Sequence, residues 1–305
     1  MPLFHLHRNI ALKFIAYLMF LSVIPLLVLG ITSYHISRSI LQAEAQGYTL
    51  QLLRNQRDYL DLQLDQVEAL LANIAGVETI LQALGDPRRR TDVYTRLATQ
   101  ARIGYILNNY SNLKGLISID IFTLDGDHYH VGDTLDVGQV DTTAMQRLMQ
   151  SALDSDRLVL WAGVERNVNT HSTHEQVITA TKVLRRMNRE TLTQEPVALL
   201  LANYSVNELY DRFHRIDLGE NAYIQVVDQR GRLIYHPDPA RIGSRIDEPP
   251  WHVSAEPEVC LTATIAGQPY AISRVAVPRN GWYLESIIPT APFPPRLSRF
   301  STTPP

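Results

Sequence analysis

The side chains of this 305-residue chain that could take part in chemistry are mainly imidazoles. His128 and His130 alternate along one predicted strand, so both rings lie on the same face of that strand. His171 and His174, followed by Glu175, lie in a polar segment. Either pair could bind a metal ion, but neither has a third ligand at a suitable spacing. The sequence therefore favours surface histidines, and we expect no metal and no cofactor.

Motifs for enzyme catalysis are absent from the sequence. It contains no Walker loop, no nucleophile elbow and no HExxH pair, and Cys260 is its only cysteine. The net charge of −3 provides no basic surface, so nucleic acid is not an expected partner. We expect a protein that is not an enzyme. An anchored hydrolase is the weakest alternative, because no nucleophile and base can be paired in the sequence.

The elements that position these residues begin with an apolar run near the N-terminus. Residues Phe14 to Ile31 carry no formal charge, and a helix of that length crosses the hydrocarbon layer of a membrane. We expect a transmembrane helix over residues 14–34, in a single-pass protein of the plasma (inner) membrane. Arg8 and Lys13 precede the run, so the positive-inside rule places residues 1–13 in the cytoplasm and the bulk of the chain outside. A cleaved signal peptide is the alternative, although its apolar core would be unusually long.

A seven-residue apolar repeat follows and predicts a stalk helix over residues 35–84. Its positions are Leu53, Leu60, Val67, Ile74 and Leu81. Such a seam needs a partner along its whole length. We expect its membrane-near half to pair with a second copy, which gives a homodimer through the stalk helix, and its far half to pack on its own domain. The segment Gly85–Arg90 ends the helix, and its three arginines are expected to form a solvated turn.

Short alternating segments separated by turns make up the rest of the chain and predict an α+β fold. A helix over about 92–110 precedes strands at 116–124, 128–131, 157–161, 176–183 and 197–202, with short helices at 144–153 and 204–214. A second set of strands covers 223–228, 232–235, 259–265, 270–277 and 282–288. Each set contains a strand that reverses at a turn with Asp and Gly. We expect two tandem antiparallel-sheet modules, over residues 85–214 and 215–290.

Two stretches of the second module resemble a known family. Gly219–Asp238, which continues to Ile242 and Gly243, is similar to the membrane-proximal half of a double Cache domain, and Asn280–Pro289 is similar to its last strand. Double Cache domains are the extracytoplasmic sensors of bacterial membrane receptors such as chemoreceptors, sensor histidine kinases and diguanylate cyclases. The resemblance implies two PAS-like modules, of which the first is membrane-distal and the second membrane-proximal.

The resemblance also implies a binding site, because the distal module of double Cache sensors usually holds the ligand. The candidate ligand-binding residues of this chain are Tyr129, Trp161, Gly163, Arg166, Thr179 and Asn203. Trp161 could supply an aromatic wall, and Arg166 a bidentate contact to a carboxylate. Asn203 stands where amino-acid-binding members carry an aspartate that holds the ligand's ammonium group. An amide cannot supply that charge, so an amino-acid ligand is not expected.

The C-terminal residues 291–305 form an atypical Pro-rich tail, where a receptor of this kind would return through the membrane. We expect a chain truncated before the second transmembrane helix of its relatives. The predicted function is sensing: a small-molecule ligand binds in the distal module, and the signal passes through the stalk helix. The alternative is a membrane-anchored dimeric scaffold, or a receptor remnant, with no ligand.

Overall fold

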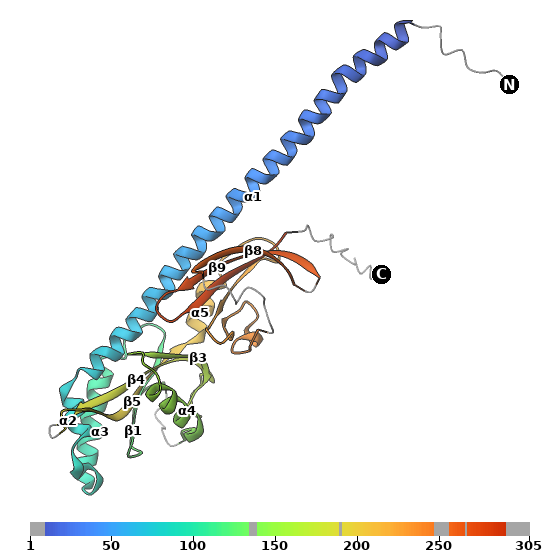
Figure 1. The fold of residues 1–305 in the computed structure, drawn as a ribbon. Helices are drawn as coiled ribbons and strands as arrows, with labels where there is room; N and C mark the ends of the chain where they lie inside the picture. The colour runs from blue at the N-terminus through green and yellow to red at the C-terminus, as the bar shows by residue number, and fades with distance from the viewer. Residues whose placement is uncertain (1–9, 134–138, 189–190, 247–255, 266, 291–305) are drawn as a thin grey trace, which may run out of the picture. The chain divides into compact units, whose positions relative to one another are not determined.

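The computed structural model describes residues 10–290, except for residues 134–138, 189–190, 247–255 and 266 (Figure 1). The chain divides into two compact units, residues 1–51 and residues 52–305, and each is described by itself. The first unit is helical from Ile10 onward, as part of helix α1 (Ile10–Ala75). Among the described residues, α1 is the one helix long and apolar enough to cross a membrane, which agrees with the predicted span at 14–34. The predicted Pro-rich tail lies outside the described residues.

The second unit begins with the far half of α1, which is an amphipathic core helix. Its predicted seam is buried, as expected for packing within one domain; the buried residues are Leu53, Leu60, Leu64, Val67, Leu71 and Ile74. The predicted helix over 35–84 is not continuous, however. It stops at Ala75, and α2 (Glu78–Leu84) starts after Val77, whose backbone is extended (ψ 100°). Gly76, a poor helix former, accounts for the break.

The first sheet has five antiparallel strands in the order β2-β1-β5-β4-β3. They are β1 (Leu116–Thr123), β2 (His128–Gly132), β3 (Leu160–Arg166), β4 (Gln176–Met187) and β5 (Gln194–Ser205). Helix α3 (Val93–Asn108) precedes the sheet, and α4 (Thr142–Leu153) connects β2 to β3. Strand β3 begins three residues later than predicted and extends to Arg166. A bulge between Trp161 and Gly163 interrupts its alternation.

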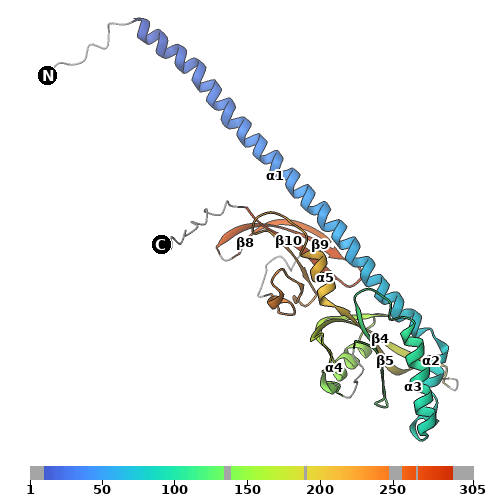
Figure 2. The same cartoon turned by 180° about the vertical axis from the view of Figure 1, so that it is seen from behind.

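The second sheet repeats this arrangement, with the order β7-β6-β10-β9-β8. Its strands β8 and β9 are labelled in Figure 1, and β8, β9 and β10 in Figure 2. Its strands are β6 (Tyr223–Val227), β7 (Leu233–Tyr235), β8 (Glu258–Ile265), β9 (Gln268–Val277) and β10 (Trp282–Pro289). Helix α5 (Val206–Phe213) joins the two sheets, and a short 3-10 helix, η2 (Pro239–Arg241), follows β7. The predicted α+β fold with two antiparallel sheets is confirmed.

The arginine-rich segment after α2 differs from the solvated turn that the sequence predicts. It forms a 3-10 helix, η1 (Pro87–Arg90), and Arg89 is only 3% exposed. The Arg89 guanidinium pairs with Asp125 (Nη2 to Oδ2, 3.0 Å) and with Asp127, which both lie in the turn between β1 and β2. Arg88 keeps the predicted solvent exposure. Through Arg89, η1 therefore links the β1–β2 hairpin to the helices that precede the sheet.

The two sheets meet at β3. Arg232, which follows β6, donates to the carboxylates of Asp228 (Nε to Oδ2, 2.8 Å) and Glu165 (Nη1 to Oε1, 2.7 Å) and to the carbonyl oxygen of Ala162. Gly163 has φ +83°, and a Cβ atom there would lie 2.7 Å from Nη2 of Arg232. Glycine at this position thus allows the arginine to lie directly on β3.

Candidate functional site

The two faces of the first sheet have different surroundings, because side chains alternate along each strand. On one face, Tyr204 donates to Gln63 of α1 (3.2 Å) and Trp161 donates to Glu68 of α1 (2.9 Å). We call the opposite face the α4 face. Its apolar half packs against α4 in a cluster that contains Phe122, Ala144, Leu148, Leu199 and Leu201. Its polar half lies outside this cluster.

Asp120 is the centre of the polar half of the α4 face. Its carboxylate is fully buried, and Oδ1 lies 2.8 Å from His128 Nε2 and 2.7 Å from His130 Nδ1. The hairpin places these groups together, because Asp120 pairs with His130 across the strands and Phe122 pairs with His128. The His128 ring also stacks on the Phe122 ring, with centroids 4.1 Å apart, which restrains its orientation.

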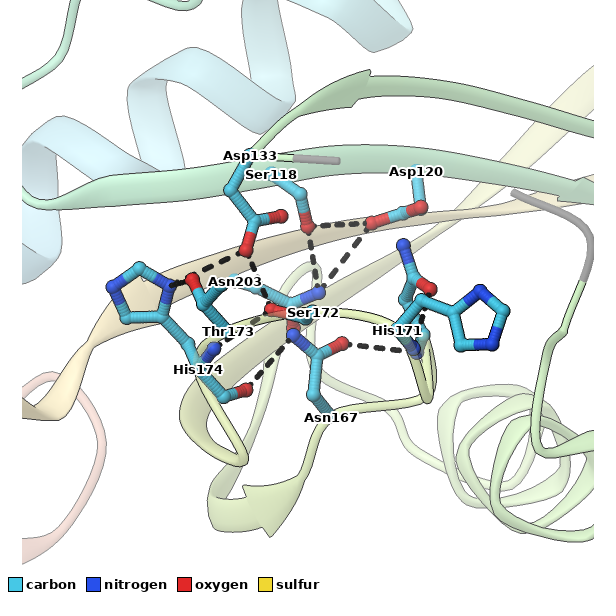
Figure 3. A network of polar contacts seen from close by, with 10 residues as sticks. Ser118, Asp120, Asp133, Asn167, His171, Ser172, Thr173, His174 and Asn203 are labelled. Atoms are coloured by element: carbon cyan, nitrogen blue, oxygen red, sulfur yellow. Dashed lines mark hydrogen bonds and ion pairs between the residues drawn. The ribbon is translucent and has the colours of Figure 1, made fainter. Parts of the chain in front are cut away.

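Two further side chains contact the other carboxylate oxygen, and a third supports them. Ser118 Oγ donates to Asp120 Oδ2 (2.7 Å), and Asn203 Nδ2 lies 2.9 Å from Ser118 Oγ and 3.4 Å from Oδ2 (Figure 3). Thr179 Oγ1 in turn donates to Asn203 Oδ1 (2.9 Å). Strand register places Asn203 of β5 between Ser118 of β1 and Thr179 of β4. These six residues, Ser118, Asp120, His128, His130, Thr179 and Asn203, are called the Asp120 network.

The network keeps Asp120 ionised despite its burial. Burial opposes the charged form, but the hydrogen bonds from His128 and His130 outweigh it and lower the pKa of Asp120 from 3.8 to about 2. The site therefore presents a carboxylate flanked by two imidazoles at neutral pH. Such a group attracts cations and hydrogen-bond donors.

The segment 167–175 lies next to the network and is ordered by its own side chains (Figure 3). Asn167 Nδ2 donates to the carbonyl oxygen of His174 (3.2 Å), and the backbone N–H of His174 donates to Ser172 Oγ (3.0 Å). The segment is tied to the end of β2, because His174 Nδ1 lies 3.3 Å from Asp133 Oδ2. A groove of about 500 Å³ opens at this edge of the sheet, and its lining includes Ser118, Asp133 and His174.

Two of the six residues predicted from the sequence, Thr179 and Asn203, come together in the Asp120 network. Tyr129 lies on the opposite side of β2 from the two histidines, and Arg89 Nη1 approaches its hydroxyl (3.4 Å). Burial is the largest influence on that hydroxyl and raises the pKa of Tyr129.

The other three predicted residues lie along β3 and are not members of the network, although Gly163 pairs with Thr179 across the strands. Trp161 faces α1 and contacts the ring of Trp282 from the second sheet, with centroids 5.8 Å apart. Gly163 lies under Arg232. Arg166 is exposed at the end of β3, opposite Gln176. Contact of any of these residues with a ligand stays a prediction.

The expectation of surface histidines at 128 and 130 is wrong. The His128 side chain is 13% exposed and the His130 side chain 5%. The missing third partner is Asp120, which the sequence analysis did not single out. A signal was present, since folding the predicted hairpin about Asp125-Gly126 brings Asp120 opposite His130. A charged residue inside an otherwise apolar strand is itself unusual and indicates a paired, functional group.

Comparisons with known proteins extend this picture. Residues 37–294 match the family model dCache_1, described as Cache domain. The ligand-binding domain of the Pseudomonas fluorescens chemoreceptor CtaA in complex with L-isoleucine has a similar fold, with a TM-score of 0.59 and 14% identity over 83% of this chain and 96% of that one. The ligand-binding domain of Mlp24 with asparagine gives a TM-score of 0.60 at 15% identity, over 83% and 95% of the two chains. A comparison with curated protein sequences gives no match.

A histidine kinase domain shares the fold as well. The extracellular domain rpHK1S-Z16, assigned to a histidine kinase, has a TM-score of 0.60 at 14% identity, over 80% of this chain and 95% of that one. Identities this low establish a shared fold, whereas the family match covers most of the sequence. The matched residues include the far half of α1 and both sheets. The chain therefore belongs to the Cache domain family, as a double Cache sensor domain rather than an enzyme.

Proposed function

We propose that this chain is the extracytoplasmic sensor of a membrane-bound signal-transduction receptor, with residues 1–13 in the cytoplasm and a solute-binding site in the first module. The observation that carries the proposal is the Asp120 network. It gathers several buried polar side chains on one sheet face, beside a groove of about 500 Å³. Ligand sites in proteins combine a concave surface with a few polar groups that fix orientation, and this face offers both.

The ligand is not expected to be an α-amino acid whose ammonium group is held by a carboxylate at position 203, as the family resemblance would imply. The carboxylate in this region is Asp120 rather than residue 203, where the amino-acid-binding members carry an aspartate. Both oxygens of Asp120 already accept hydrogen bonds, from the two imidazoles and from Ser118. An ammonium group would therefore have to displace existing donors. A solute that uses the imidazoles as well as the carboxylate fits the site better.

Signal relay through the stalk helix is the second part of the proposal. Glu68 of α1 accepts a hydrogen bond from Trp161 of β3 through Oε1 (2.9 Å) and pairs through Oε2 with Arg279 (3.1 Å), which precedes β10. Arg279 also contacts Asp65 and Asp61, one and two turns before Glu68 on α1. A displacement of β3 on ligand binding would thus act on α1 directly. A packed helix with two discrete positions can carry such a change.

Thermal unfolding of the full-length chain in detergent micelles tests the binding proposal. A panel of amino acids, carboxylates, amines, purines and divalent cations would be compared at fixed protein concentration. A solute present at about 100 times its Kd should stabilise the fold by about 2.7 kcal/mol and raise the Tm accordingly. A flat response across the panel would contradict sensing and favour the anchored scaffold.

A matched pair of variants locates the site. Asn203→Ala removes the link between Ser118 and Thr179 and should abolish or strongly reduce the Tm increase. Asn109→Ala changes an exposed amide at the end of α3 and should leave the increase intact. An equal effect of both variants would place the ligand elsewhere.

A further inference from the structure

The three central residues of the Asp120 network form a potential set of metal ligands. One carboxylate oxygen of Asp120 and one ring nitrogen each of His128 and His130 all lie within 4.8 Å of one another. Two imidazoles and one carboxylate suit Zn²⁺, Cu²⁺, Ni²⁺ or Fe²⁺, whereas Mg²⁺ and Ca²⁺ prefer oxygen ligands. We propose that these residues bind a divalent transition-metal cation, and that this cation is the solute sensed by the first module. The inference rests on the proposed sensor function and names its ligand class.

The hydrogen-bonding state of His128 supports this assignment. Its Nε2 atom faces Asp120 Oδ1, while its Nδ1 atom is buried and has no hydrogen-bond partner among the described residues. The ring proton can move to Nδ1, which leaves Nε2 free to ligate. His130 can ligate through Nδ1 in the same way, with its proton on Nε2.

The distances are compatible with a cation after a small rearrangement. Asp120 Oδ1 now lies 2.8 and 2.7 Å from the two nitrogens. Two ligands bound tetrahedrally at about 2.1 Å from one Zn²⁺ lie roughly 3.4 Å apart. The carboxylate and the rings therefore need to separate by less than about 1 Å, which side-chain rotation supplies without a change of strand register.

The residues around the set are those that a metal-bound carboxylate requires. Asp120 Oδ2 accepts a hydrogen bond from Ser118, which in turn accepts one from Asn203. These bonds leave Oδ1 as the ligating oxygen and fix the carboxylate orientation. Three protein ligands also leave at least one coordination position open, as in exchangeable rather than structural sites. Reversible occupancy is what a sensor needs.

The experiment uses the full-length chain in detergent micelles, without an affinity tag and after treatment with a chelator. Zn²⁺ binding would be measured by calorimetry, and Co²⁺ binding by its visible absorption. We expect saturable binding of one cation per chain, which raises the Tm. X-ray absorption of the Zn²⁺-loaded wild-type protein should show nitrogen and oxygen ligands that include two imidazoles. Fewer than two imidazoles, or no saturable binding, would overturn the proposal.

Variants assign the ligands. Asp120→Asn, His128→Gln and His130→Gln should each weaken Zn²⁺ binding at least about tenfold, and Ser118→Ala should weaken it by about tenfold through loss of carboxylate orientation. His214→Gln is the matched control, because His214 is exposed and lies outside the network. Unchanged affinity in all three ligand variants would assign the cation to another site, and the inference would be wrong. If a variant fails to fold, the X-ray absorption measurement on the wild-type protein still tests the two imidazole ligands.

The outcome for the metal is separable from the outcome for the proposed function. If Zn²⁺ and Co²⁺ do not bind but an organic solute raises the Tm, the metal assignment fails and the sensor proposal stands. If neither a cation nor an organic solute binds, both proposals fail.

Discussion

A single carboxylate, Asp120, sets the chemistry of the first sheet. It remains ionised in a fully buried position because two imidazoles and a hydroxyl direct hydrogen bonds to it. The cost of placing a charge in the interior is offset only while all of these donors are present. Loss of any one of these donors is therefore expected to affect both stability and binding.

The depressed pKa of Asp120 predicts how stability depends on pH. The pKa is about 2 in the folded chain and 3.8 when unperturbed, so the unfolded chain binds the proton first as the pH falls. The contribution of Asp120, about 2 kcal/mol, is present above pH 4 and is lost as the pH falls towards 2. Asp120→Asn should remove it, as measured by urea unfolding at several pH values. Asp156→Asn, at an exposed position, should unfold like the wild type; an unchanged pH dependence in Asp120→Asn would contradict the assignment.

The two adjacent arginines of η1 offer a second comparison at this scale. Arg89→Met should lower the free energy of unfolding by about 2 kcal/mol, because Asp125 and Asp127 lose their shared cation while the buried stem is replaced by a similar volume. Arg88→Met should cost less than about 0.5 kcal/mol, since the Arg88 side chain is 77% exposed. Equal destabilisation of the two variants in chemical unfolding would show that the ion pairs of Arg89 do not stabilise the link between η1 and the β1–β2 hairpin.

Part of the site could be predicted from the sequence. The remaining residues could not, for a physical reason that can be named. Asn203 and Thr179 could be placed because the residue pattern predicts the two strands that carry or precede them, and the family resemblance drew attention to Asn203. Asp120 needed the cross-strand register of β1 and β2, which follows from the turn geometry rather than from any motif. Trp161 donates to Glu68 of α1 and Gly163 lies under Arg232, and their contact with a ligand stays a prediction.

Among the elements, strands with clear alternation or apolar runs were predictable and interrupted ones were not. The hairpin β1–β2 and the strands β9 and β10 lie close to their predicted ranges, because turns with Gly bound them. The start of β3 and the break in the stalk after Ala75 were missed. The break follows from Gly76, a poor helix former inside an otherwise continuous apolar repeat, and β3 carries a bulge between Trp161 and Gly163 that interrupts its alternation.

The β3 element carries its own prediction. Gly163→Ala should destabilise the chain more than Gly126→Ala, although both glycines have positive φ (+83° and +91°). A Cβ atom at residue 126 meets nothing within 4 Å, so only the backbone strain of about 1 kcal/mol lowers the free energy of unfolding of that variant. A Cβ atom at 163 also displaces Arg232 from β3. Similar Tm values for the two variants would show that the Arg232 contact is weak.

At the scale of the whole molecule, the homodimer predicted from the sequence can be tested in the first unit. Ile36 and Ile40 are more than half exposed and lie one turn apart on α1, a stripe suited to a second copy. In a Cys260→Ser background, Ile40→Cys should form a disulfide-linked dimer in membranes under mild oxidation. Gln42→Cys, which lies on the opposite side of the helix, should cross-link much less. Equal cross-linking at both positions would contradict a stalk interface on this stripe.

The edge-to-face contact of Trp161 with Trp282 gives the molecule an intrinsic optical reporter. Two indoles at 5.8 Å interact strongly enough to produce coupled bands in circular dichroism, and the only other tryptophan, Trp251, can be replaced. One ring belongs to each sheet, and the Trp161 ring also donates a hydrogen bond to Glu68 of α1. Any shift of the sheets against each other would change the spectrum, so conformational response could be followed in the unlabelled protein without knowledge of its output.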